Sequence, residues 1–258
     1  MRRNILITGA SSGLGAEMAR QFAAKGHNLA LTARRTERLE ALQGEVASRY
    51  PQVQVVIHSL DVNDHDQVFE VFRKIDAELP LDRIIVNAGL GKGASLGTGR
   101  FDANRQTALT NFVGALAQAE AAMELFRSRN AGHLVFISSI SGLRGLPKTV
   151  TTYAATKAGI ASLAEGLRME LLGKPIKVST IYPGYIRSEM NEHVANTPLI
   201  VDTEPGVRAI VAAIESEKSK AYVPAWPWAP LAQGDAVRPT RRTEEDAVKR
   251  HRALTFEM

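Results

Sequence analysis

The sequence predicts a single α/β domain built around a doubly wound, mostly parallel sheet. Short runs of β-branched and aliphatic residues alternate with longer segments of helical periodicity. Most of these runs are almost continuously apolar, which is typical of strands buried on both faces of a parallel sheet. With 258 residues, of which 45% are hydrophobic, the chain is long enough to form one large core. Alternation of this kind favours right-handed βαβ units.

Seven strands and six helices account for most of the chain. Asp64 is a typical N-cap residue for the third helix, and Pro205 fits the first turn of the last one. His133, at the start of the fifth strand, is expected at the surface. The predicted strands are residues 4–8, 28–33, 54–59, 83–87, 133–138, 177–182 and 221–223. The predicted helices are residues 13–25, 36–49, 64–78, 103–129, 151–172 and 204–216.

The C-terminal part of the sequence differs from the rest. Residues 224–230 contain three prolines and both tryptophans, and they predict a rigid loop in which Trp226 and Trp228 cover the edge of the sheet. The alternative is an apolar wall for a substrate, or a contact with a membrane or another subunit. Residues 234–258 are rich in charge and poor in large apolar side chains, which predicts a mobile surface tail outside a domain of residues 1–233.

The composition excludes several classes of protein. The chain has no cysteine, which excludes disulfides, thiol catalysis and cysteine-ligated zinc, and we predict no metal site. The net charge of +5 comes from scattered lysines and arginines, so we do not expect nucleic-acid binding. A phosphate-bearing cofactor would explain part of this charge. Since the sequence shows neither a signal peptide nor an apolar stretch of membrane-spanning length, we expect a cytoplasmic protein.

A glycine-rich turn, Thr8-Gly-Ala-Ser-Ser-Gly-Leu-Gly15, lies between the first strand and the first helix. Gly9 allows a sharp turn, Gly13 allows the backbone to approach a pyrophosphate, and Gly15 allows the helix to pack on the strand. The N-terminus of the helix offers free N–H groups and a partial positive charge to the phosphates. The turn therefore predicts a dinucleotide site, with an ordinary glycine-rich turn as the alternative.

The end of the second strand bears on the choice between NAD(H) and NADP(H). An NAD(H) site usually carries an acidic residue there, which accepts a hydrogen bond from the ribose 2′-hydroxyl. This strand ends in Ala33-Arg34-Arg35, and a guanidinium can pair with a 2′-phosphate. We therefore predict NADP(H), with Arg34 as the first candidate and Arg35 as either a second one or a solvated residue. Asp61, after the third strand, either accepts from the adenine amino group or caps the next turn.

Tyr153 and Lys157 are the strongest chemical signal in the chain. Residues four apart on a helix share a face, so the lysine ammonium can lie near the phenol. A free phenol has a pKa of about 10, too high for a general base at neutral pH, and a nearby cation lowers it. The spacing alone is a common accident, but here it follows a glycine-rich turn in an α/β chain.

Taken in order, these motifs resemble those of the short-chain dehydrogenase/reductase family, over residues 4 to about 224. The resemblance implies a Rossmann-type sheet of seven strands and a homo-oligomer, commonly a dimer or a tetramer. It also implies an NADP(H)-dependent oxidoreductase that reduces a ketone or aldehyde to an alcohol, or catalyses the reverse. The matching motifs are the glycine-rich turn, Asp61, Asn87-Ala88-Gly89, Asn111, Ser139, Tyr153 with Lys157, and Pro183-Gly184.

The resemblance also implies a role for each matching residue. Tyr153 acts as general acid in reduction and as general base in oxidation, while Lys157 lowers its pKa and holds the nicotinamide ribose. Ser139 donates to the substrate oxygen, and Asn111 holds a water in a proton relay that reaches Lys157. The implied cofactor-binding residues are Gly9, Ser11, Ser12, Gly13, Leu14, Gly15, Arg34, Arg35, Asp61, Val62, Asn87, Ala88, Gly89, Tyr153, Lys157, Pro183, Gly184, Ile186 and Ser188.

Two of these assignments have alternatives. Ser138, Ser139 and Ser141 compete for the serine role, and Gly142, three residues after Ser139, favours Ser139 because it matches the family pattern. Asn111 is alternatively a buried helix residue whose side chain is satisfied by the backbone.

Substrate and function class also stay open in part. For Asn87, the alternative to cofactor binding is a purely structural role. A non-catalytic NADP(H)-binding sensor or scaffold is one rival function, and an epimerase or dehydratase that holds its cofactor tightly is another. Residues 187–203 are expected to cap the pocket, and their apolar side chains favour a fairly apolar substrate. These side chains are Met190, Val194, Leu199, Ile200 and Val201.

Overall fold

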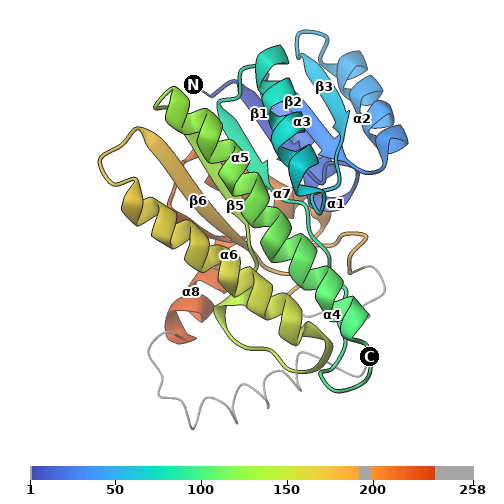
Figure 1. The fold of residues 1–258 in the computed structure, drawn as a ribbon, viewed down its shortest axis with the longest axis vertical. Coiled ribbons are helices and arrows are strands. Elements are labelled where there is room, and N and C mark those ends of the chain that lie inside the picture. The colour runs from blue at the N-terminus through green and yellow to red at the C-terminus, as the bar shows by residue number, and fades with distance from the viewer. Residues whose placement is uncertain (1, 192–198, 236–258) are drawn as a thin grey trace.

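The computed structural model describes residues 2–191 and 199–235, and its centre is a seven-stranded sheet (Figure 1). The strand order is β3-β2-β1-β4-β5-β6-β7, and every strand pair in it is parallel. This confirms the predicted doubly wound fold, whose order reverses between β1 and β4. The strands are β1 (Asn4–Thr8), β2 (Asn28–Ala33), β3 (Val55–Ser59), β4 (Arg83–Val86), β5 (Gly132–Ile137), β6 (Ile176–Pro183) and β7 (Lys220–Val223).

Helices cover both faces of the sheet, as Figure 1 shows. Leu6 and Ile84 belong to the apolar cluster under α3, α5 and α6, whereas Ile5 and Ile7 belong to the cluster under α1, α2 and α7. Because both faces are buried, the strand sequences are apolar throughout and do not alternate. The helices are α1 (Gly13–Ala24), α2 (Thr36–Arg49), α3 (His65–Glu78), α4 (Phe101–Ala108), α5 (Gly114–Ser128), α6 (Thr151–Glu170), α7 (Thr203–Glu215) and α8 (Ala225–Asp235).

Local signals at two helix starts are confirmed. Asp64 is the N-cap of α3, and its side chain accepts a hydrogen bond from the backbone N–H of Gln67, at 3.1 Å. Pro205 lies in the first turn of α7, where the missing N–H of proline removes no helical hydrogen bond. Short-range capping chemistry is therefore enough to place these two boundaries.

The predicted helix over residues 103–129 is interrupted. Between α4 and α5 the chain forms a π-helix, Leu109–Val113, which contains Asn111. The following residue, Gly114, passes so close to the end of β3 that a Cβ atom there would lie 2.8 Å from the carbonyl oxygen of Val62. The chain stays helical through this widened turn, and the apolar pattern of the sequence did not reveal it.

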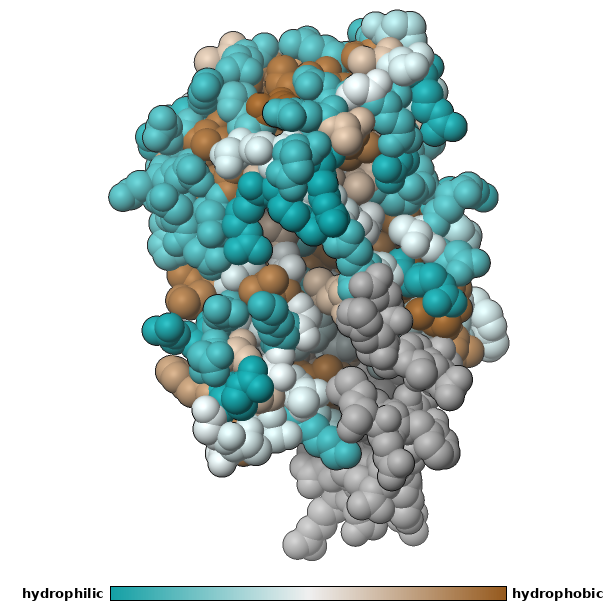
Figure 2. All heavy atoms as spheres, turned by 90° about the vertical axis from the view of Figure 1, so that its right-hand side faces the viewer, coloured by the Kyte–Doolittle hydropathy of each residue, from teal (hydrophilic) through white to brown (hydrophobic). Residues whose placement is uncertain are grey.

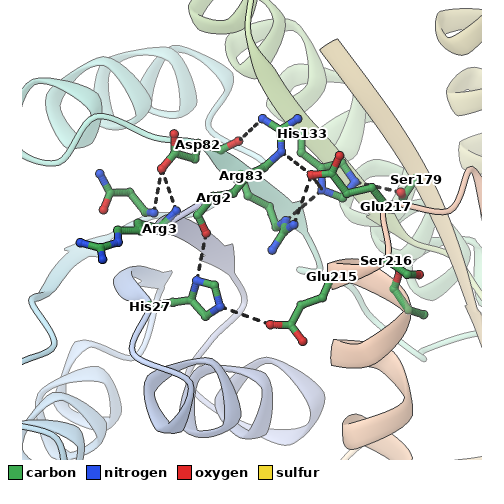
Figure 3. A network of polar contacts seen from close by, with 12 residues as sticks. Arg2, Arg3, His27, Asp82, Arg83, His133, Ser179, Glu215, Ser216 and Glu217 are labelled. Atoms are coloured by element: carbon green, nitrogen blue, oxygen red, sulfur yellow. Dashed lines mark hydrogen bonds and ion pairs between the residues drawn. The ribbon is translucent and has the colours of Figure 1, made fainter. Parts of the chain in front are cut away.

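The expected surface position of His133 is wrong, since its exposed fraction is 0%. Its strand, β5, lies between β4 and β6, so even its first side chains are covered. The ring accepts a hydrogen bond from Arg83 Nε at its Nδ1 atom (2.9 Å), and its Nε2–H therefore donates to Ser179 Oγ (2.8 Å; Figure 3). Arg83 in turn lies 3.5 Å from the carboxylate of Glu217. Burial, and then the charge of Arg83, lowers the pKa of His133 to about 2.

Residues 224–230 are not a loop, because most of them form the first part of α8. The helix is kinked at Trp226, which has an extended backbone (φ −97°, ψ 132°), and the peptide bonds before Pro224 and Pro227 are cis. Trp228 is 6% exposed, whereas Trp226 is 78% exposed, so only one of the two tryptophans covers the sheet edge. Pro227 follows the kink and begins the second helical piece, where the missing N–H of proline removes no helical hydrogen bond, whereas Pro230 lies inside the helix.

Part of the C-terminal prediction lies outside the described residues. Helix α8 extends to Asp235, and residues 236–258 of the predicted tail lie outside the described ranges. Within those ranges, no helix combines the length and the apolar character needed to span a membrane. Figure 2 shows a face of the molecule on which hydrophilic side chains predominate and apolar ones appear as small separate patches.

The buried state of His133 predicts how stability depends on pH. The folded chain keeps this imidazole neutral, whereas the unfolded chain binds a proton on it below about pH 6.5. Since the unfolded state then binds more protons, His133 lowers the free energy of unfolding by about 1.4 kcal/mol for each pH unit below that value. We expect His133→Gln to lose stability less steeply than the wild type in urea titrations between about pH 7 and about pH 5.

The exposed His65 provides the matched control, because His65→Gln removes a histidine without removing a buried one. This variant should follow the wild-type pH dependence. If the free energy of unfolding falls with pH as steeply in His133→Gln as in the wild type, the burial argument is contradicted.

Candidate active site

The glycine-rich turn lies at the carboxyl end of β1, next to the reversal in strand order. Gly9 and Gly13 have φ values of +65° and +52°, a region that glycine adopts without strain. A Cβ atom at Gly15 would lie 2.3 Å from the carbonyl oxygen of Gly9, and a Cβ atom at Gly9 would lie 2.8 Å from Cα of Ala88. These glycines therefore allow α1 and the end of β4 to close around the turn.

Asn87 fastens the end of β4 to this turn. Its Nδ2 atom donates to the carbonyl oxygens of Thr8 (2.9 Å) and Gly9 (3.4 Å). The Thr8 hydroxyl accepts from the backbone N–H groups of Asn87 (3.1 Å) and Ala88 (3.2 Å). The side chain of Asn87 therefore holds the backbone of the turn, which is the purely structural role given above as its alternative.

The N-terminus of α1 fits the pyrophosphate of a dinucleotide. Ser12, the N-cap residue, makes no side-chain capping hydrogen bond, and the first turn contains no acidic residue. The first N–H groups of the helix therefore face the turn without an anionic partner from the cap. At Gly13, a Cβ atom would have only Ser188 Cβ within 4 Å, at 3.5 Å. A bulkier residue at position 13 would fill this cradle.

Arg34 and Arg35 lie in different environments. The side chain of Arg34 is 64% exposed, and its NH1 atom is 3.9 Å from Oδ2 of Asp61. Arg35 donates to Ser11 Oγ (3.3 Å) and Ser12 Oγ (2.7 Å) of the glycine-rich turn. Arg35 is therefore anchored at the candidate cofactor site, and the alternative of a purely solvated residue does not describe it.

Asp61 and Val62 follow β3 at the same edge of the sheet. The Oδ1 atom of Asp61 accepts from the backbone N–H (3.0 Å) and the side-chain Nδ2 (2.9 Å) of Asn63. Asp61 thus caps the next turn, as its alternative proposed, and its second carboxylate oxygen faces Arg34. Val62 is buried in the core cluster.

Tyr153 and Lys157 lie one turn apart on α6, as their spacing predicts. The Lys157 ammonium is 5.7 Å from the centroid of the Tyr153 ring and donates to the carbonyl oxygen of Ile137 at 2.8 Å. Burial lowers the pKa of Lys157 to about 8. The lysine is still mostly charged at neutral pH, so it places a cation beside the phenol.

The expected lowering of the Tyr153 pKa is not found in this structure. Burial raises the pKa of the phenol, a hydrogen bond with the Ser139 side chain acts in the opposite direction, and Tyr185 raises it further. Lys157 points to the Ile137 carbonyl rather than to the phenol oxygen, which explains why it does not counter the burial. The phenol is therefore protonated at neutral pH and can donate a proton. Tyr185 was not indicated by any sequence signal.

The three serines after β5 have different partners. Ser138 is buried and donates to the carbonyl oxygen of Lys157 at 2.8 Å, so its hydroxyl is used within the core. Ser139 accepts from the N–H of Ser141 (3.1 Å) and is the serine that bonds with Tyr153. A Cβ atom at Gly142 would lie 2.7 Å from the Lys157 carbonyl carbon. This glycine allows the turn that carries Ser139 to pack on α6.

The side chain of Asn111 is held by the backbone. Its Nδ2 atom donates to the Leu90 carbonyl oxygen (2.8 Å), and its Oδ1 atom accepts from the Leu90 N–H (2.7 Å). This matches the structural alternative for Asn111. A Cβ atom at Gly89 would lie 3.2 Å from Asn111 Oδ1 and 3.7 Å from Lys157 Nζ, so Gly89 leaves room for both side chains.

The segment after β6 returns over the candidate site. Gly184 packs against the indole of Trp228, so closely that a Cβ atom would lie 2.0 Å from Nε1. Asn191 donates to the Ile186 carbonyl oxygen (2.8 Å) and accepts from the Ser188 N–H (2.8 Å). No motif had indicated Asn191. Of the apolar side chains expected in this segment, that of Val194 lies outside the described residues.

Comparison with known sequences identifies relatives over most of the chain. A family model described as short chain dehydrogenase matches residues 3–198. A protein named uncharacterized oxidoreductase from Mycobacterium tuberculosis is 53% identical over 247 residues, which cover 95% of this chain and 98% of that protein. A protein of the same description from Myxococcus xanthus is 37% identical over 189 residues, covering 73% and 74%. The match to the Mycobacterium protein covers 95% of this chain, so it must include some of residues 234–258. Part of the predicted tail therefore has a counterpart in that protein.

Comparison with solved structures identifies the same architecture. A short-chain dehydrogenase from Sphingobium yanoikuyae, in complex with NADPH, superposes with a TM-score of 0.81 at 25% identity, covering 99% of this chain and 96% of that one. An alcohol dehydrogenase from Comamonas testosteroni, described as specific for bulky-bulky ketones, has a TM-score of 0.77 at 26% identity, covering 93% and 96%.

The hydrogen bonds of Asn87 predict a loss of stability on truncation. Asn87→Ala leaves the Thr8 and Gly9 carbonyl oxygens without their side-chain donor, and we expect the free energy of unfolding to fall by about 1 to 2 kcal/mol. Denaturant titration measures this change. The exposed Gln52 serves as control, since Gln52→Ala should change stability by less than about 0.5 kcal/mol. Equal losses in the two variants would contradict the structural role of Asn87.

Proposed function

The chain belongs to the short-chain dehydrogenase family of oxidoreductases, and we propose that it reduces a ketone or aldehyde to an alcohol with NADPH, or catalyses the reverse. One observation carries the proposal. Ser139 bonds with Tyr153, Lys157 lies one turn away, and Gly89 links this group to the end of β4 beside the glycine-rich turn. A phenol, a lysine and a hydroxyl gathered beside a dinucleotide cradle are the parts that a carbonyl reduction requires.

The proposed cofactor is NADP(H), which supplies or accepts the hydride when bound. The N-terminus of α1 and the Arg35 guanidinium would hold its phosphates, and Lys157 would hold the nicotinamide ribose. The absence of an acidic residue at the end of β2 supports NADP(H) over NAD(H). Arg34 and Arg35 both remain candidates for the 2′-phosphate, and the anchoring of Arg35 to Ser12 favours Arg35.

The proposed proton donor is the Tyr153 phenol. Its raised pKa keeps it protonated at neutral pH, so in reduction it can donate to the carbonyl oxygen as that oxygen gains negative charge. The Ser139 hydroxyl would donate a second hydrogen bond to the same oxygen. After this step Tyr153 is left as a phenolate, with the Lys157 ammonium 5.7 Å from the centroid of its ring. In oxidation the same phenolate would accept the proton of the alcohol.

The proposed substrate is medium-sized and fairly apolar. Most of the large apolar side chains that the described surface exposes come from the segments after strands β4 to β7, at the carboxyl edge of the sheet. Apolar surface concentrated around a polar catalytic group is typical of a small-molecule pocket. The Comamonas enzyme is described as specific for bulky-bulky ketones, which supports a ketone as the reacting group. The side chains concerned are Leu96, Phe101, Leu143, Met190, Leu199 and Trp226.

We also propose that the protein is a cytoplasmic homo-oligomer, a dimer or a tetramer. A groove between α5 and α6 opens to the surface, and its lining is largely apolar. A second copy packed on this face would remove that surface from water. Light scattering on the purified protein would measure the mass directly, and a monomer would contradict the proposal. The apolar lining includes Phe112, Leu116, Met123, Leu163 and Leu167.

The role of Tyr153 predicts a variant that binds the cofactor but does not turn over. Tyr153→Phe removes only the hydroxyl, so we expect turnover with a panel of apolar ketones to fall by at least about a hundredfold while NADPH affinity stays near wild type. Tyr222→Phe, which removes a hydroxyl on β7, is the control and should retain activity. Near-normal turnover in Tyr153→Phe would contradict the assignment of Tyr153 as proton donor, whereas a wild type that binds NADPH without any turnover would favour the sensor or scaffold alternative.

The cofactor assignment predicts a difference between two titrations. Nicotinamide fluorescence should report tighter binding of NADPH than of NADH, and Arg35→Gln should weaken NADPH by about tenfold with little effect on NADH. Equal affinities in the wild type would mean that both arginines are only structural or solvated charges. Cofactor that stays bound through purification would instead favour the epimerase or dehydratase alternative.

A further inference from the structure

The arginines at the start of α2 already have an anionic partner from a distant part of the chain. Glu189, in the segment after β6, places Oε1 2.5 Å from NH1 of Arg38. Its Oε2 atom lies 3.4 Å from both NH1 and NH2 of Arg35. The Ser12 hydroxyl also hydrogen-bonds to this carboxylate. One carboxylate thus meets two guanidinium groups and the N-cap residue of α1.

This contact reaches across the carboxyl edge of the sheet. Arg38 belongs to α2, beyond β2, whereas Glu189 comes from the segment that follows β6, on the other side of β1. Ser188, the preceding residue, lies over the glycine-rich turn, where its Cβ is 3.5 Å from the position of a Cβ at Gly13. Residues 188 and 189 therefore lie above the turn that would receive the pyrophosphate.

The groups that hold Glu189 are those that recognise phosphate. Guanidinium groups pair with carboxylates and phosphates through the same planar donors, so the two anions can compete for one site. The site holds two positive charges and one negative charge, and a 2′-phosphate carries more charge than a carboxylate. Arg38, and then Ser12 and Arg35, lowers the pKa of Glu189, so the carboxylate is ionised at neutral pH.

We propose that Glu189 is an internal competitor for the 2′-phosphate of NADP(H), and that Arg38 joins Arg35 in binding that phosphate. The inference rests on the proposed function, because it takes NADP(H) to be the cofactor. NADH has no 2′-phosphate and does not need the two guanidinium groups, so Glu189 opposes one cofactor and not the other. Glu189 and Arg38 are then determinants of cofactor preference, beyond the residues that the sequence motifs indicate.

The competition should be modest. The side chains of Arg38 and Glu189 are 46% and 47% exposed, and ion pairs this accessible to water are weak. Glu189 therefore tunes the affinity for NADP(H) without excluding it. Replacing the carboxylate by an amide should strengthen NADPH binding about three- to fivefold, which is the range expected for a surface ion pair.

The test is a set of equilibrium titrations that do not depend on catalysis. Nicotinamide fluorescence gives Kd for NADPH and for NADH in the wild type, Glu189→Gln and Arg38→Gln. Calorimetry with adenosine 2′,5′-bisphosphate repeats the comparison at the adenosine end alone. Glu40→Gln is the charge-matched control, since Glu40 is exposed on α2 outside this cluster. Glu189→Ala is the second variant if the amide disturbs folding, as judged by thermal melts.

We expect Glu189→Gln to lower Kd for NADPH and for the bisphosphate about three- to fivefold, with NADH unchanged. Arg38→Gln should raise Kd for NADPH about fivefold, and Glu189→Gln should have a smaller effect in that background, because only the longer contact between Glu189 and Arg35 remains. Glu40→Gln should leave every Kd at its wild-type value.

Each other result overturns the inference. If the wild type prefers NADPH and Glu189→Gln leaves NADPH affinity unchanged or weaker, the competition is refuted while the proposed cofactor stands. An equal gain for NADPH and NADH, or the same gain in Glu40→Gln, would show a general charge effect. A loss of NADH affinity in Glu189→Gln would mean that Glu189 accepts from the ribose 2′-hydroxyl. A wild type that prefers NADH would overturn the cofactor assignment and the inference together.

Discussion

The close approach of helix α1 to the end of β1 is the constraint on which the rest of the site depends. It requires glycine at positions 9 and 15, because a Cβ at either would meet backbone atoms within 3 Å. The same closeness lets Asn87 reach the Thr8 and Gly9 carbonyl oxygens and hold the end of β4 against the turn. With these two strands joined, the N-terminus of α1 faces the point where strand order reverses, where an α/β sheet binds its ligands.

A second junction places the chemical groups relative to that cradle. Helix α6 is held to the end of β5 by the hydrogen bond from Ser138 to the Lys157 carbonyl and by the close packing of Gly142 on the same residue. The Lys157 ammonium then bonds to the Ile137 carbonyl. Three contacts thus centre on one residue of α6 and leave Ser139 facing the Tyr153 phenol. Burial at this junction moves the pKa of the phenol up and that of the lysine down, in each case toward the neutral form.

The charged groups at the two ends of the sheet differ in how far they are buried. At the amino end, His133, Arg83 and Glu217 are linked within the fold, and this network is structural (Figure 3). At the carboxyl end, Arg35 and Arg38 share one exposed carboxylate, and the cap of α1 leaves its N–H groups facing the turn. Removing one partner of a buried ion pair leaves an uncompensated charge and is costly, so such a pair stays together, while exposed and partly compensated charges can exchange partners with a ligand. The proposed competition of Glu189 with a phosphate follows from that difference.

Periodicity, turn chemistry and helix geometry act over a few residues, so the sequence was enough to predict the order of strands and helices, the glycine-rich turn and the Tyr153–Lys157 pair. The burial of His133 and the different exposures of Trp226 and Trp228 became visible only in the folded chain. The same holds for the π-helix at Asn111 and for the hydrogen bonds by which Asn111 and Asn87 hold backbone groups. The folded chain also shows that Arg35, rather than Arg34, is anchored to the turn, and that Glu189 pairs with Arg38. Each of these features depends on a contact with a residue far along the chain or on how closely two elements pack. A local sequence pattern contains no information about such contacts.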